Sequence, residues 1–124
     1  MGLRLLAVDD HRESLDLIMA ILVNAGADVR VSASAAEALR IVQDWRPHVL
    51  ISDIEMPGED GYAFIRKVRS LDGDGGGKIP AVALTAYGKA EDRHRATSAG
   101  FNMHVAKPVD PNELVTIVAT LAGR

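Results

Sequence analysis

The chain has 124 residues, a length that fits one domain with a single substantial hydrophobic core. Its net charge of −3 argues against a basic surface for nucleic acid, and its lack of cysteine excludes disulfides, thiolate zinc sites and a cysteine nucleophile. No apolar run approaches the ~20 residues that span a bilayer. We therefore expect one cytoplasmic domain over residues 1–124 that contacts neither nucleic acid nor membrane.

The first half of the chain alternates short apolar runs with segments of helical period. An apolar run bounded by charged or turn residues is typical of a strand that is buried on both faces in a parallel sheet. In chain order we predict a strand at residues 3–8, a helix whose apolar face carries Leu15, Ile18, Met19 and Leu22, a strand at 29–32, and a helix capped by Ser34.

The second half continues the same alternation. We predict strands at residues 49–52, 81–85 and 103–106, with helices over 62–68 and 89–99 and a last helix that opens at Asp110-Pro111. A glycine-rich segment, residues 72–77, precedes the fourth strand. Phosphate-binding glycine loops follow a strand and open a helix, so this segment is interpreted as a flexible surface connection.

Five successive strand–helix units predict an α/β fold. The expected architecture is a single doubly wound (βα)5 three-layer sandwich with a parallel sheet in the order 2-1-3-4-5, which is flavodoxin-like. The C-terminal ends of parallel strands share one edge of the sheet, and ligands bind outside that edge, near the point where the strand order reverses.

Charged and polar side chains follow four of the five predicted strands. They are Asp9 and Asp10 after the first, Asp53 after the third, Thr85 at the end of the fourth and Lys107 after the fifth. Three neighbouring carboxylates repel one another, and a hard divalent cation such as Mg²⁺ relieves that repulsion. Lys107 and Thr85 could bind phosphate oxygens. This set of groups suits phosphoryl transfer to Asp53 as a carboxylate nucleophile.

These residues resemble a known family in their local contexts. The matching segments are Asp9-Asp10, S-D-I-E-M-P-G-E-D-G around Asp53, Thr85-Ala86 and Lys107-Pro108. Together they resemble the receiver domain of response regulators in two-component signalling, from Leu3 to the end of the chain. The resemblance implies a phosphorelay role, in which Asp53 accepts a phosphoryl group from the phosphohistidine of a histidine kinase or a histidine phosphotransfer domain.

The resemblance also implies a ligand set around Asp53. Mg²⁺ would be held by Asp10, Asp53 and the main-chain carbonyl of Glu55, with Asp9 behind them or acting through water. Lys107 would bind a phosphoryl oxygen, and the Lys107-Pro108 peptide bond is expected to be cis.

The family switches its surface when it is phosphorylated. The resemblance implies that Thr85 follows the phosphoryl group and moves the loop after the fourth strand, together with the surface of the fourth helix and fifth strand. His104 occupies the switch position where the family usually has Tyr or Phe, and imidazole fills less space than those rings. The resemblance also implies that Glu55 and Tyr87 stand at positions that adjust the lifetime of the phosphoryl group.

Two other classes of protein share part of this pattern. A haloacid-dehalogenase-like phosphohydrolase also uses an Asp nucleophile and Mg²⁺, but it needs a second Asp where this chain has Glu55, and a cap domain. A non-phosphorylated interaction domain on the receiver fold would have lost an acid or the lysine, and this chain keeps them. We therefore expect a signalling domain rather than an enzyme, with only intrinsic phosphotransfer and autodephosphorylation.

The sequence A-K-P-V-D-P-N-E-L resembles receivers of hybrid sensor histidine kinases. The chain is expected either to act alone or to form the cytoplasmic part of a larger sensor kinase, and a homodimer is compatible with both. Phosphodonor proteins are expected to meet the first helix near Arg12, Leu15 and Asp16.

Overall fold

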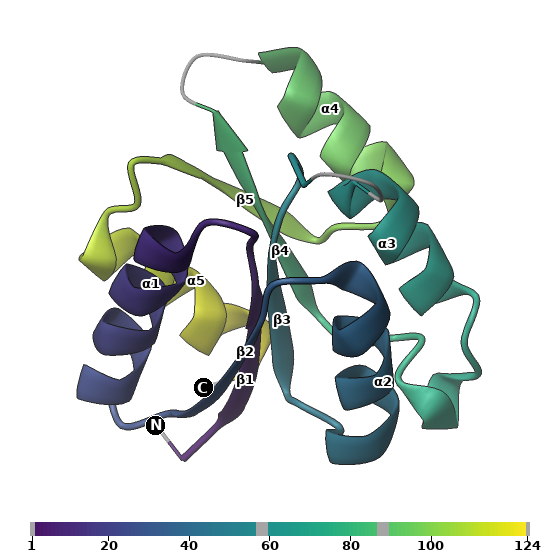
Figure 1. Cartoon of the computed structure of the whole chain (residues 1–124), viewed down its shortest axis with the longest axis horizontal. Helices are drawn as coiled ribbons and strands as arrows, with labels where there is room; N and C mark the ends of the chain where they lie inside the picture. The colour runs from purple at the N-terminus through teal and green to yellow at the C-terminus, as the bar shows by residue number, and fades with distance from the viewer. Residues whose placement is uncertain (1, 57–59, 87–89, 124) are drawn as a thin grey trace.

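The structure, a computed structural model, describes residues 2–56, 60–86 and 90–123. Over these residues five strands alternate with five α-helices (Figure 1). The elements are β1 (Arg4–Val8), α1 (Arg12–Asn24), β2 (Asp28–Ser32), α2 (Ala35–Trp45), β3 (Val49–Asp53), α3 (Gly61–Arg69), β4 (Ala81–Ala86), α4 (Ala90–Ala99), β5 (Met103–Lys107) and α5 (Pro111–Leu121). None of the described helices has the length and apolar character needed to cross a membrane.

The five strands form one parallel sheet in the order β2-β1-β3-β4-β5, which confirms the predicted fold. Helices α1 and α5 cover one face, and α2, α3 and α4 cover the other (Figure 1). The register pairs Val8 with Ser52, Asp53 with Leu84, and Ala86 with Lys107. The residues that follow or end β1, β3 and β5 therefore lie at the same edge of the sheet.

The strands are buried on both faces because each face packs against its own layer of helices. Leu6 and Leu50 belong to the cluster that includes Phe64 of α3, whereas Leu5 and Ile51 belong to the opposite cluster, with residues of α1 and α5. A strand with two buried faces needs apolar residues at successive positions. This requirement explains the unbroken apolar runs that made the strands predictable.

Side-chain caps set where several helices begin. The Ser34 hydroxyl accepts a hydrogen bond from the Glu37 N–H at 3.2 Å, and the Asp110 carboxylate accepts one from the Asn112 N–H at 2.9 Å. Both caps were predicted, and Pro111 follows Asp110 at the first turn as expected. Asp60 caps α3 in the same way, which the sequence pattern alone had not indicated.

Helix α1 differs from its prediction at one position of the apolar face. Leu15, Ile18 and Leu22 are buried as expected, but Met19 is 37% exposed. A residue four positions after Leu15 lies about 40° around the helix, on the side away from Ile18, so Met19 sits at the edge of the face. The burial of Leu15 also removes it from the surface predicted to meet phosphodonor proteins, whereas Arg12 and Asp16 are exposed.

The glycine-rich segment 72–77 is more ordered than a flexible surface connection. Residues Gly73–Gly75 form a short 3-10 helix, and Gly77 is buried. A Cβ atom at Gly77 would collide with the Leu71 carbonyl oxygen, so a larger residue does not fit there. The prediction of a flexible surface connection is therefore wrong at Gly77, where the backbone packs closely on itself, whereas residues 72–74 are exposed as predicted.

Arg69 at the end of α3 ties four parts of the chain together. Its guanidinium donates hydrogen bonds to the carbonyls of Gly77, Ile79 and Gly100, at 3.1, 2.6 and 2.9 Å, and to the Asn102 side-chain oxygen at 3.0 Å. Burial lowers the pKa of Arg69 from its ordinary value. These bonds join the ends of α3 and α4 to the segments that lead into β4 and β5.

We expect Arg69→Met to lower the free energy of unfolding by about 2–4 kcal/mol, because it keeps the apolar stem but leaves several carbonyls without their donor. The exposed Arg66→Met on the same helix serves as the matched control and should change stability by no more than ~0.5 kcal/mol. Urea denaturation measures both. Equal effects of the two substitutions would contradict the role assigned to Arg69.

Candidate functional site

The candidate site lies at the edge of the sheet where β1 and β3 end. Asp9 directly follows β1, and its N–H donates to the Ser32 carbonyl at 3.1 Å; Asp53 is the last residue of β3 and Lys107 the last of β5. Strand β2 lies on one side of β1, whereas β3, β4 and β5 lie on the other side, so the strand order reverses between β1 and β3. Ligands of doubly wound sheets bind at such a reversal of strand order.

A close backbone contact positions the end of β3. The Gly61 N–H donates to the Ile54 carbonyl at 3.1 Å. A Cβ atom at Gly61 would lie 2.6 Å from the Ile54 Cα and closer still to the Asp53 carbonyl oxygen. Glycine at the start of α3 therefore allows the helix to pack directly against the residue that carries the candidate nucleophile.

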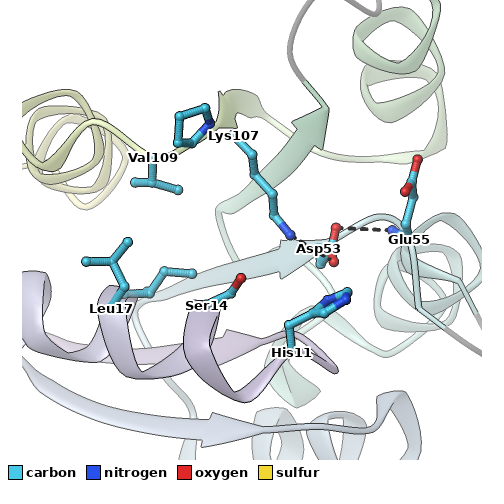
Figure 2. A pocket seen from close by; sticks show the side chains of 9 residues that line it. His11, Ser14, Leu17, Asp53, Glu55, Lys107 and Val109 are labelled. Carbon is cyan, nitrogen blue, oxygen red and sulfur yellow. Dashed lines mark hydrogen bonds and ion pairs between the residues drawn. The ribbon is translucent and has the colours of Figure 1, made fainter.

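Lys107 bridges two buried carboxylates. Its Nζ atom lies 3.2 Å from Asp9 Oδ2 and 3.1 Å from Asp53 Oδ2, and the two acidic side chains are 0% and 4% exposed. The lysine extends from β5 toward Asp53 in Figure 2. The structure thus brings together three residues that are distant in sequence, as the strand-end pattern predicted.

The three groups differ in how easily they ionise. Burial raises the pKa of Asp9, but the hydrogen bond from the His11 N–H, at 3.0 Å, and the charge of Lys107 outweigh burial and leave this pKa below its ordinary value. Burial also raises the pKa of Asp53, and the Glu55 N–H bond and Lys107 do not offset it, so this pKa stays above the ordinary value. Burial lowers the pKa of Lys107, yet its bonds to Asp53 and Asp9 raise it overall.

Asp10 adds a third carboxylate with free coordination capacity. Its Oδ1 atom is buried and accepts no hydrogen bond from the described residues. Ligand atoms of Asp9, Asp10, His11 and Asp53 all lie within 4.8 Å of one another. One ammonium for three acids leaves an excess of negative charge, and a carboxylate oxygen without a donor is a suitable ligand for a hard cation. These residues could hold a metal ion.

A cavity of about 480 Å³ opens beside these groups. Its lining comes from the start of α1, the loop after β3 and the segment after β5 (Figure 2). The residues are His11, Ser14, Leu17, Ile18, Asp53, Glu55, Lys107, Pro108 and Val109. The Lys107-Pro108 peptide bond is cis. His11 and Ser14 were not predicted as site residues, although the place of His11 directly after Asp9-Asp10 was a usable signal.

The residues predicted to act as a switch are not among those that line this cavity. Thr85 is 1% exposed and pairs with Ala106 in the sheet, whereas the half-buried His104 pairs with Ala83. Since side chains alternate along a strand, Thr85 and His104 project from the same face, which α3 and α4 cover. Thr85 is not among the residues that line the cavity. The assigned switching roles stay predictions.

Some predicted residues fall in undescribed parts of the chain. Tyr87, predicted to adjust the lifetime of the phosphoryl group, lies outside the described residues, as do Pro57 and Gly58. Glu55 is described; it is exposed and is one of the residues that line the cavity.

Comparison with known proteins yields a family match over residues 5–119, to the response regulator receiver domain. A 14.6 kDa protein of Leptolyngbya boryana is 44% identical over 92% of this chain and 86% of its own length. Other relatives are longer: the chain covers 52% of the response regulator Rre1 of Synechocystis and 8% of the hybrid signal transduction histidine kinase D of Dictyostelium discoideum.

Solved structures agree with this match. A putative response regulator from Chloroflexus aurantiacus superposes with a TM-score of 0.94 at 35% identity, and each chain is covered completely. The receiver domain of the sensor histidine kinase PA1611 from Pseudomonas aeruginosa gives a TM-score of 0.90 at 31% identity, again over both whole chains. That receiver holds a magnesium ion in its active site cleft.

The raised pKa of Asp53 predicts that the metal-free protein carries an unfavourable charge. An acid whose pKa is higher in the folded state destabilises the fold once it is ionised, fully above the folded pKa and not at all below the ordinary value of 3.8. Asp53→Asn should therefore raise the free energy of unfolding by about 0.5–2 kcal/mol at pH 7 in EDTA, and the gain should shrink as the pH falls toward 3.8.

Denaturant titrations across this pH range measure the effect, with the exposed Asp44→Asn on α2 as the matched control. The control should stay within ~0.5 kcal/mol of the parent at each pH. A loss of stability in metal-free Asp53→Asn at neutral pH would show that Lys107 compensates Asp53 fully.

Proposed function

This chain belongs to the response regulator receiver domain family of two-component signalling, and from that premise we propose that Asp53 is its phosphoacceptor. Accepting a phosphoryl group is the general role of the family. The observation that carries the assignment to Asp53 is its contact with Lys107, at 3.1 Å, on the wall of an open cavity. Asp9 is bound by the same lysine but does not line that cavity.

The side chains support in-line transfer to an ionised carboxylate. An Asp53 oxygen attacks phosphorus, the bond from phosphorus to the donor histidine nitrogen breaks, and the nitrogen keeps the electron pair. The nucleophile is a carboxylate, so no side-chain base has to remove a proton from it. Lys107 lies within reach of the added phosphoryl oxygens and exchanges its bond to Asp53 for one of them.

Asp10, Asp53 and the main-chain carbonyl of Glu55 would hold Mg²⁺, with Asp9 behind them or acting through water, and the ion supplies charge neutralisation for the phosphoryl oxygens. The unpartnered buried Oδ1 of Asp10 supports this assignment. The magnesium ion in the Pseudomonas aeruginosa receiver supports it independently.

The output is proposed to be a shift of the loop after β4 and of the α4–β5 surface, through Thr85 and His104. The described part of α4 is weakly anchored, because its buried side chains are the small Ala96 and Ala99. A further link is the Arg95 guanidinium, which lies 4.3 Å from the ring centre of Tyr62 on α3. An element held by so little apolar area can change position at low cost in free energy.

The same proposal names the partners and setting. A histidine kinase or histidine phosphotransfer domain would supply the phosphoryl group at the cavity, beside the exposed Leu17 of α1. Residues 1–124 would act as one cytoplasmic receiver, alone or within a hybrid sensor kinase such as the longer Dictyostelium relative, and a homodimer fits either setting. Glu55 and Tyr87 would adjust the phosphoryl lifetime.

Intact mass after incubation with Mg²⁺ and acetyl phosphate tests the phosphoacceptor. We expect one phosphoryl adduct on the parent and on the control Asp44→Asn, and none on Asp53→Asn or in EDTA. An adduct of equal yield on Asp53→Asn would refute the assignment. No adduct on a folded parent that binds Mg²⁺ would favour an interaction domain on the receiver fold.

Lys107→Ala tests the proposed role of the lysine charge in binding the transferred phosphoryl group. Loss of one charge-assisted hydrogen bond of about 1.5–3 kcal/mol predicts adduct formation slower by about 10–100-fold at saturating Mg²⁺. The exposed Lys78→Ala is the matched control and should retain the parent rate. An unchanged rate in Lys107→Ala would show that the lysine only pairs with the two acids.

A further inference from the structure

The proposed phosphotransfer gives no role to His11, yet this residue lies against the acidic cluster. His11 is the N-cap residue of α1, but its side chain makes no capping hydrogen bond. Its Nδ1 atom lies 3.3 Å from Asp9 Oδ1 and 3.2 Å from Asp10 Oδ1. In Figure 2 the ring extends from the start of α1 toward Asp53. The imidazole therefore lies at the acidic cluster and does not cap helix α1.

The spacing of the ligand atoms fits one coordination sphere. Donors about 2.0–2.2 Å from a metal ion lie at most ~4.4 Å from one another. The ligand atoms of Asp9, Asp10, His11 and Asp53 are within 4.8 Å of one another, so small side-chain rotations would suffice. The His11 backbone is held by its N–H bond to Asp9, and its ring, 67% exposed, already contacts the carboxylates of Asp9 and Asp10 through Nδ1.

The hydrogen bonding of Asp10 Oδ1 gives a further reason to place a cation here. This buried oxygen accepts no hydrogen bond from the described residues and lies 3.2 Å from His11 Nδ1. A cation that binds Asp10 is thus within a short ring rotation of an imidazole nitrogen. All-oxygen sites suit Mg²⁺, whereas imidazole suits ions such as Ni²⁺, Co²⁺ and Zn²⁺.

We propose that His11 is a nitrogen ligand of this site and gives it a preference for borderline first-row divalent cations over Mg²⁺. The inference rests on the proposed function, because the same acids would hold Mg²⁺ for phosphotransfer. Mg²⁺ uses the oxygen ligands and leaves His11 unbound. Ni²⁺ or Co²⁺ takes the imidazole as well and competes for the place that Mg²⁺ occupies.

Calorimetric titration of the tag-free protein with Ni²⁺ and with Mg²⁺ tests the proposal. Loss of a group that only hydrogen-bonds to a metal ligand costs about 10–100-fold in metal affinity. Loss of a direct ligand should cost at least as much, so His11→Ala should weaken Ni²⁺ binding by about tenfold or more. The same variant should change Mg²⁺ affinity by less than about twofold, because Mg²⁺ favours oxygen ligands. His94→Ala, which removes an exposed imidazole on α4, is the matched control and should bind both ions as the parent does.

Electron spin-echo spectroscopy of the Cu²⁺-loaded protein supplies a second readout. Imidazole nitrogen modulation is expected in the parent and in His94→Ala, and its loss is expected in His11→Ala. Unchanged Ni²⁺ affinity in His11→Ala, or retained modulation, would overturn the role of His11 even where Mg²⁺ binds and Asp53 is phosphorylated. Conversely, selective weakening of Ni²⁺ would support that role even if Asp53→Asn still formed an adduct.

Discussion

Charge compensation at the carboxyl edge of the sheet is the constraint on which the site depends. Lys107 reaches both Asp9 and Asp53, and the two carboxylates are almost completely removed from solvent. Asp10 stands beside them with a buried oxygen that no described group donates to. One ammonium cannot neutralise three acids, and isolated buried charge is costly. The excess negative charge can bind a divalent cation, and a carboxylate of the cluster can attack an electrophilic phosphorus.

The fold supplies this arrangement through its topology rather than through local sequence. Parallel pairing puts the ends of β1, β3 and β5 on the same edge, so residues almost a hundred positions apart become neighbours. The contact of Gly61 with the backbone of Asp53 and Ile54 fixes the end of β3 against α3. Thr85 and His104 project from the α3–α4 face of the sheet, where the proposed switch would act. The buried side chains in the described part of α4 are the small Ala96 and Ala99, which is the basis for proposing that this helix moves.

Features that depend on local sequence patterns could be predicted from the sequence, whereas features that depend on three-dimensional packing could not. The five strands, the order of the sheet and the Ser34 and Asp110 caps followed from apolar runs and local hydrogen-bonding residues. Convergence of Asp9, Asp53 and Lys107 followed from strand polarity. The exposure of Met19 could not be foreseen, because a residue at the edge of an apolar face is buried or exposed according to its neighbours. The place of His11 directly after Asp9-Asp10 was a usable signal, but the contact of its ring with both carboxylates depends on the backbone at the start of α1 and was found only in the structure.

A crystal structure grown with Mg²⁺ and beryllofluoride, which mimics a phosphoryl group on a carboxylate, tests the central claim most directly. We expect beryllium bonded to an Asp53 oxygen, Lys107 Nζ moved from that carboxylate to a fluorine, and a metal ion against Asp10 and Asp53. Beryllofluoride bound elsewhere, or Lys107 still bridging Asp9 and Asp53 beside an occupied site, would contradict the claim that this under-compensated cluster is the phosphoacceptor centre.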